Sequence, residues 1–93
     1  MSDSLTRQRF VVSGRVQGVG FRWFVLRWAQ RLALRGWVRN RDDGTLEAEA
    51  EGRPEAVAEF ARRLRAGPAG ARVDEVEQTA LPPEGGPPFF DIL

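Results

Sequence analysis

The sequence predicts an α+β fold whose main elements follow the order βαββαβ. In two segments apolar residues recur every three or four positions, as in helices, and in others they alternate with polar residues, as in half-buried strands. Glycine and proline stand between these segments, where elements have to end. This order predicts an antiparallel sheet with both helices packed on one of its faces.

The first half of the chain opens with an expected strand over residues 7–13, in which Phe10 and Val12 share one face. A helix is expected over residues 22–34, and Gly36 is expected to break it. Its apolar stripe consists of Phe21, Val25, Trp28, Ala29 and Leu32. The spacing therefore predicts an amphipathic helix that lies against the sheet.

A hairpin is expected next. Residues 37–41 have the pattern of a strand, Asp42-Asp43-Gly44 is typical of a tight turn, and residues 45–51 form the returning strand. Alternation in the returning strand points Leu46, Ala48 and Ala50 to the core and Glu47, Glu49 and Glu51 outward. One face of this strand is thus expected to be buried.

The second helix is expected to begin at Pro54 and to stop at Gly67-Pro68. Its apolar stripe consists of Val57, Phe60, Ala61 and Leu64. Residues 73–79 have the pattern of a fourth strand, residues 81–88 of a loop, and residues 90–93 of a short closing strand. Together these elements predict a ferredoxin-like sandwich.

Size and composition limit what the protein can be. Its 93 residues are enough for one domain, expected over residues 1–93, and no apolar run is long enough to span a bilayer. The charged N-terminal residues make a signal peptide unexpected, so we expect a cytoplasmic protein. The absence of histidine, cysteine and lysine excludes Ser-His-Asp and Cys-His catalysis, the usual zinc sites and Schiff-base chemistry.

Charge is unevenly distributed along the chain, although the formal net charge is only +1. Every charged residue between Ser4 and Arg41 is an arginine, whereas acidic residues dominate from Asp42 onward. Three interpretations remain open: a solvated basic face, a nucleic-acid surface, and a field that draws small anions toward the glycine-rich loop described next.

The loop after the first expected strand is rich in glycine and leads into a helix that starts with Arg22. Glycines allow successive backbone N–H groups to turn toward one point, and a helix start adds unpaired N–H groups. The fork of Arg22 suits phosphate oxygens. A plain tight turn would use the same glycines, and neither the P-loop nor the dinucleotide-binding pattern is present. We therefore interpret the loop as a candidate anion cradle.

The run from Gly14 to Arg22, Gly-Arg-Val-Gln-Gly-Val-Gly-Phe-Arg, resembles the first signature of the acylphosphatases. A second run, from Gly36 to Asn40 with later glycines at positions 44 and 52, resembles their second signature. The two lie at the separation that the family shows. Two departures are seen: Leu46 stands where valine is preferred, and Ala33 where many members have glycine at the end of the first helix.

The resemblance implies hydrolysis of a carboxyl–phosphate anhydride to a carboxylate and inorganic phosphate, without a metal or another cofactor. It implies that the phosphoryl group is bound by Arg22 and by backbone N–H groups of Arg15, Val16, Gln17, Gly18, Val19 and Gly20. The expected partners are a small acyl phosphate as substrate and inorganic phosphate as product and inhibitor. No nucleic acid, membrane or second subunit is expected.

The resemblance also implies that Asn40 orients the attacking water. An amide can accept a hydrogen bond from water but cannot keep its proton. By itself, Asn40 could equally be an ordinary polar residue at a strand end. We interpret Asp42 and Asp43 as turn residues, Gln17 as a structural residue that holds the loop, and Trp37 as a packing residue.

Two rival functions belong to other classes. RNA-binding modules also use the βαββαβ order, but they stack bases on aromatic residues of the third strand. This chain carries three glutamates there, which we expect to repel a phosphate backbone. A binding domain without catalysis would keep the cradle, but it would not need a residue that orients water. The enzyme interpretation is therefore the one that uses both Arg22 and Asn40.

Overall fold

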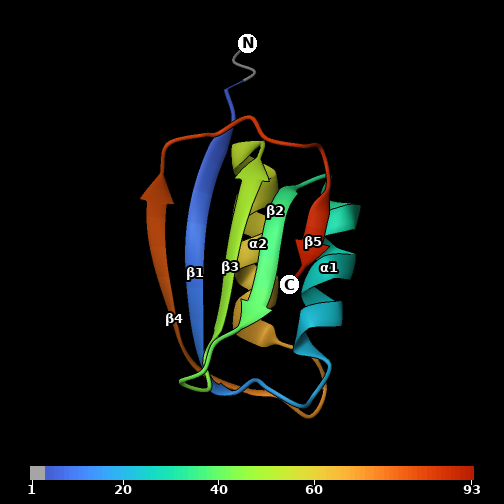
Figure 1. The fold of residues 1–93 in the computed structure, drawn as a ribbon, viewed down its shortest axis with the longest axis vertical. Coiled ribbons are helices and arrows are strands. Elements are labelled where there is room, and N and C mark those ends of the chain that lie inside the picture. Colours follow the sequence, from blue (N-terminus) through green and yellow to red (C-terminus); the bar gives the residue numbers. More distant parts are fainter. Residues whose placement is uncertain (1–3) are drawn as a thin grey trace.

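A computed structural model describes residues 4–93 of the protein, which form two helices and five strands (Figure 1). The elements are β1 (Thr6–Arg15), α1 (Phe21–Arg31), β2 (Arg35–Asn40), β3 (Leu46–Gly52), α2 (Pro54–Ala66), β4 (Arg72–Leu81) and β5 (Phe90–Ile92). Every element expected from the sequence is present, and no end is shifted by more than three residues. Within residues 4–93, neither helix is long and apolar enough to cross a membrane.

The strands form one sheet in the order β4-β1-β3-β2-β5. The first four pair antiparallel, as the sequence predicted. The short closing strand β5 instead runs parallel to β2, so the sheet is mixed. Figure 1 shows the reason: the segment between β4 and β5 crosses from one edge of the sheet to the other. It therefore enters the far edge in the direction of β2.

The core lies between the helices and the face of the sheet that they cover. Phe10 of β1 meets Phe60 of α2 edge to face, with ring centroids 5.4 Å apart, and both side chains are fully buried. The apolar stripe of α2 is buried as predicted. In α1, Trp28 lies at the margin of the stripe, with the guanidinium groups of Arg31 and Arg63 at 5.0 and 4.1 Å from its ring. Trp28 thus links the two helices at the surface rather than filling the core.

Helix α1 ends at Arg31, three residues before the predicted end, because Ala33 adopts a left-handed conformation with φ 55°. The N–H of Leu34 donates to the carbonyl of Ala29 at 2.9 Å, and the N–H of Ala33 to that of Gln30 at 3.2 Å. This pair of bonds is a Schellman motif, in which the left-handed position is usually glycine. The alanine noted in the sequence therefore occupies the helix-stop position itself.

The sequence suggested that Gly36 breaks the helix, and this prediction is wrong. Gly36 lies inside β2, after the helix has ended. Its φ is +144°, and a Cβ atom there would lie 1.9 Å from the carbonyl oxygen of Glu49 on the neighbouring strand. Only glycine permits this close approach of two backbones. Its role is in strand pairing, which local sequence patterns do not reveal.

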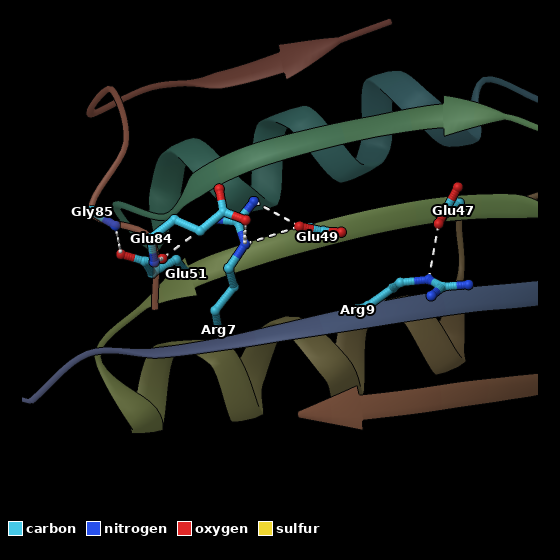
Figure 2. Close-up of polar contacts among 7 residues, drawn as sticks. All are labelled: Arg7, Arg9, Glu47, Glu49, Glu51, Glu84 and Gly85. Atoms are coloured by element: carbon cyan, nitrogen blue, oxygen red, sulfur yellow. Dashed lines mark hydrogen bonds and ion pairs between the residues drawn. The ribbon is translucent and has the colours of Figure 1, made fainter. Parts of the chain in front are cut away.

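The open face of the sheet carries an arginine–glutamate network (Figure 2). Arg7, with a side chain only 5% exposed, pairs with Glu49 at 2.8 Å and with Glu51 at 3.3 Å. Glu51 is fully buried and also accepts hydrogen bonds from the backbone N–H groups of Glu84 and Gly85, at 2.7 and 3.0 Å. These bonds fasten the segment between β4 and β5 to the sheet.

The glutamates of β3 are therefore not the free outward charges that the sequence argument assumed. They lie on the predicted face, but Glu47 is mostly covered and pairs with Arg9 at 2.9 Å and with Arg39 at 2.7 Å. Alternation determines which face a side chain occupies, and it does not determine what covers that face. The repulsion of a phosphate backbone that we expected here is consequently weakened by these arginines.

Candidate active site

The two sequence signatures come together at one end of the molecule. The loop between β1 and α1 and the turn between β2 and β3 both lie at the lower end in Figure 1. Between them is a pocket of about 230 Å³. It is lined by Val16, Gly18, Gly20, Phe21, Arg22, Trp23 and Asn40. The fold thus brings the loop, the helix start and the end of β2 to a single site.

The loop backbone supplies a row of unpaired donors. Gly18 and Gly20 both have a φ of +74°, a backbone conformation that residues with a Cβ rarely adopt. A Cβ at either position would have open space around it, so the need for glycine is conformational. Within residues 4–93, none of the backbone N–H groups from Val16 to Trp23 donates to a protein acceptor. Helix α1 begins here without a side-chain cap, which leaves its first N–H groups available to an anion.

Arg22, in the first turn of α1, is held by a residue that is distant in the sequence. Its Nη1 donates to the carbonyl oxygen of Leu93 at 3.0 Å. Leu93 is itself fixed by its N–H, which donates to the carbonyl of Val38 on β2 at 2.9 Å. One of the guanidinium N–H groups is therefore used to orient the side chain. The remaining donors of the fork are available to phosphate oxygens.

Asn40 is the last residue of β2. Because side chains alternate along a strand, it shares the helix-covered face with the fully buried Val38. Its Oδ1 is buried and accepts no hydrogen bond from any group within residues 4–93. Buried acceptors are satisfied in the great majority of cases, so an exception needs an explanation. A bound water or ligand donor in the adjacent pocket would supply one.

Gln17 joins the two halves of the site. Its Nε2 donates to the carbonyl oxygens of Arg41 at 2.8 Å and Thr45 at 3.1 Å, both in the hairpin that follows Asn40. The hairpin is also closed by a bond from the Arg41 N–H to the Thr45 carbonyl, at 2.8 Å. The side chain of Gln17 therefore holds the glycine loop to the hairpin, as a structural residue would, and sets the position of Asn40 relative to the loop.

The acidic residues beside Asn40 belong to the turn. Asp43 accepts hydrogen bonds from the hydroxyl and the N–H of Thr45, at 2.6 and 3.0 Å. These bonds, the hydroxyl first, hold the pKa of Asp43 below its ordinary value, and the nearby Arg41 adds to the effect. Asp43 is thus a turn residue, as we expected from the sequence.

Not every expected cradle residue lines the pocket. Arg15 closes β1 in register with Arg72, the side chain of Gln17 points to the hairpin, and Val19 packs against the core. Trp37 lies outside this pocket, with the guanidinium of Arg39 5.7 Å from its ring. The sequence analysis did not single out Trp23 or Leu93. Only the folded chain brings Leu93 to Arg22 and places Trp23 in the wall of the pocket.

The structure also shows which of the arginines in the basic first part of the chain pair with acidic residues. Arg7, Arg9, Arg39 and Arg41 all pair with acidic residues that follow position 42. Arg22 has no acidic partner within residues 4–93. Arg22 therefore brings positive charge to the pocket. Arg15, Arg27, Arg31 and Arg35, which lie outside the lining, also form no ion pair with an acidic side chain of residues 4–93. This arrangement favours the interpretation in which charge draws small anions to the loop.

Comparison with known proteins agrees with this geometry. The family model for acylphosphatases matches residues 8–92. An acylphosphatase of Moorella thermoacetica is 52% identical over 86 residues, which cover 92% of this chain and 92% of that protein. One of Anaeromyxobacter dehalogenans is 50% identical over 92 residues, which cover 99% of this chain and 98% of that protein.

A solved structure shows the same fold. The crystal structure of acylphosphatase from Bacillus subtilis superimposes with a TM-score of 0.91 at 40% sequence identity. The superposition covers 97% of this chain and 99% of that one. Similarity of this degree over nearly the whole length shows that the chain belongs to the acylphosphatase family.

Proposed function

We propose that the protein hydrolyses acyl phosphates to a carboxylate and inorganic phosphate at the pocket between the glycine loop and Asn40. Its membership of the acylphosphatase family supports this reaction. The unpaired N–H groups of the loop and the fork of Arg22 bind the phosphoryl oxygens and stabilise the charge of the transition state. The loop and Arg22 thus bind the phosphoryl group, and Asn40 has a different task.

The observation that carries the proposal is the buried, unsatisfied Oδ1 of Asn40 beside a row of unsatisfied donors. A pocket that only bound an anion would need the donors alone. An acceptor on a residue that lines the same pocket suits a water molecule, which donates one hydrogen bond to Asn40 and directs a lone pair toward phosphorus. Asn40 therefore orients the nucleophile.

The reaction balances without a proton donor on the leaving side. The water oxygen forms a bond to phosphorus while the bond from phosphorus to the acyl oxygen breaks, and the acyl group leaves as a carboxylate. A carboxylate is stable at neutral pH without protonation. The proton of the water cannot remain on an amide, so we assign it to a phosphate oxygen of the substrate.

Hydrolysis of acetyl phosphate, with a phosphate monoester as control substrate, tests the proposed function. We expect turnover of the acyl phosphate alone, because the monoester has a much poorer leaving group. Inorganic phosphate should inhibit competitively, since it fits the same donors. A protein that cleaves the monoester equally well, or neither compound, would contradict the proposal.

Metal independence is a separate prediction. The chain has no histidine or cysteine, and none of the acidic side chains in the described part of the chain, residues 4–93, lines the pocket where it could hold a cation. The proposed donors already perform the charge stabilisation that magnesium supplies in many phosphoryl-transfer enzymes. Activity should therefore survive dialysis against EDTA. A loss that magnesium restores would show that a metal takes part.

We also propose that residues 1–93 act as one domain, as a cytoplasmic monomer that binds neither nucleic acid nor membrane. The charged, exposed residues of edge strand β4 support the monomer, because charge on an edge opposes strand pairing between copies. Sedimentation of the purified protein, cell fractionation and binding assays with RNA and with lipid vesicles check these points.

A further inference from the structure

Trp23 lies beside Arg22 in the first turn of α1 and is 64% exposed. Its neighbours Phe21 and Val25 are buried in the core, whereas Trp23 is outside it. Within residues 4–93, the indole takes part in no ring pair, cation–π contact or side-chain hydrogen bond. Most of the Trp23 side chain is therefore open to solvent and makes none of these specific contacts with the described part of the chain.

A single exposed apolar residue is ordinary on a protein surface. Trp23 differs because its side chain forms part of the wall of the active-site pocket. The other large apolar residues of that wall, Val16 and Phe21, are each only 1% exposed. Among the residues that line the pocket, Trp23 is thus the large apolar side chain that a bound molecule can touch.

The substrate has two parts with different needs. The phosphoryl group needs hydrogen-bond donors, which the loop and Arg22 supply, and the acyl group needs an apolar surface. Aromatic rings favour stacked or edge-to-face contact with other planar groups. We propose that Trp23 is a specificity-determining residue that receives the acyl group of the substrate and favours aromatic over acetyl-sized acyl groups. This assignment rests on the proposed hydrolysis of acyl phosphates.

The chemistry of the step predicts which kinetic constant Trp23 affects. The bond that breaks joins phosphorus to the acyl oxygen, and the apolar part of the acyl group does not change during the step. Its contact with the indole is therefore as strong in the bound substrate as in the transition state. Such uniform binding lowers KM and leaves kcat unchanged.

The test compares benzoyl phosphate with acetyl phosphate in the full-length wild type, Trp23→Ala and Trp23→Phe. The ratio of kcat/KM for the two substrates is measured in each protein, and the ratios are compared between proteins, which removes the difference in intrinsic reactivity. In Trp23→Ala we expect this ratio to fall by about 3–10-fold, through a higher KM for benzoyl phosphate. Trp23→Phe keeps an aromatic face and should retain most of the preference.

Two controls separate this role from others. Trp28→Ala removes the same side chain from the same helix, away from the pocket, and should leave the ratio unchanged. The inhibition constant of inorganic phosphate should not change in Trp23→Ala, since phosphate has no acyl group. Circular dichroism checks that the variants are folded.

Equal effects of Trp23→Ala on both substrates, or no effect, would overturn the assignment while leaving the hydrolase activity in place. A wild type that hydrolyses neither acyl phosphate would instead overturn the proposed function, and this assignment with it.

Discussion

At the scale of single residues, the site consists of groups whose hydrogen-bonding capacity is not used by the fold. The loop N–H groups have no acceptor and the Oδ1 of Asn40 has no donor within residues 4–93. Unsatisfied polar groups cost folding free energy, so they are expected where a ligand satisfies them. Function and stability therefore make opposite demands at these positions.

Asn40→Ala should lower kcat by about 10²–10³-fold, the usual effect of losing one such polar group in a transition state. Phosphate affinity should remain nearly intact, because the donors that bind phosphate are untouched. The free energy of unfolding should stay the same or rise by up to about 1 kcal/mol, since a buried unsatisfied oxygen is removed. Asn40 does end its strand, but its Oδ1 is buried, unlike that of an ordinary polar residue at an exposed strand end.

Three measurements check this prediction: kcat on acetyl phosphate, phosphate binding by calorimetry, and unfolding in urea. A parallel loss of binding and rate would show that Asn40 belongs to the phosphate cradle. A clear loss of stability would indicate a structural role instead.

Arg22→Lys should not preserve activity, although it keeps the charge. A lysine has no planar fork, so it cannot hold the Leu93 carbonyl and a phosphate oxygen with parallel N–H groups. We expect kcat/KM to fall by about 10²-fold or more, with kcat and KM both affected. Arg27→Lys, on the exposed side of the same helix, is the matched control. Kinetics close to wild type in Arg22→Lys would mean that charge alone is sufficient.

At the scale of elements, the end of α1 carries a residue that does not suit its conformation. Ala33 is exposed and has φ 55°, a conformation that costs an L-residue roughly 1–2 kcal/mol. Ala33 and Leu34 nevertheless form the two bonds of the Schellman motif. The requirements of the turn into β2 therefore outweigh the local preference of alanine.

Ala33→Gly should raise the free energy of unfolding by about 0.5–1 kcal/mol, because glycine adopts this conformation without strain and its own entropy cost offsets part of the gain. Ala58→Gly, at an exposed position inside α2, should lower it by about 1 kcal/mol. Urea unfolding of both variants checks the opposite signs. A destabilising Ala33→Gly would show that the left-handed conformation is not retained in solution.

At the scale of the whole molecule, the segment between β4 and β5 runs from one edge of the sheet to the other and leads, through β5, to the candidate site. Glu51 fastens one end of this segment (Figure 2). Leu93, just after β5, holds Arg22. Burial opposes ionisation of Glu51, but the N–H groups of Glu84 and Gly85 and the charge of Arg7 outweigh it, so the pKa of Glu51 lies below its ordinary value. The ionised carboxylate is therefore the form that holds this segment.

Because the pKa of Glu51 is lower in the folded state than in the unfolded chain, its ionisation stabilises the fold above the ordinary glutamate pKa of about 4.3. That contribution is lost as the pH falls through the lowered pKa. Glu51→Gln should cost about 2–3 kcal/mol at pH 7 and much less at pH 3. Thermal unfolding of both proteins between pH 7 and pH 3 measures the difference.

A matched control is Glu59→Gln, which breaks exposed ion pairs with Arg62 and Arg63 on α2 and should have a much smaller effect at pH 7. A Glu51→Gln variant as stable as wild type at pH 7 would show that the carboxylate does not hold the segment.

The sequence by itself was sufficient to determine the order of the elements, the core positions of α2 and the two signatures of the site. Each of these depends on local periodicity or on a contiguous run of residues, such as the one from Gly14 to Arg22. Tertiary structure alone decided that β5 runs parallel to β2, that Gly36 serves strand pairing and that Glu51 is buried. It also decided that Leu93 holds Arg22 and that Trp23 opens onto the pocket. These contacts join residues far apart in the chain, or depend on what packs over a surface, and no local pattern encodes either.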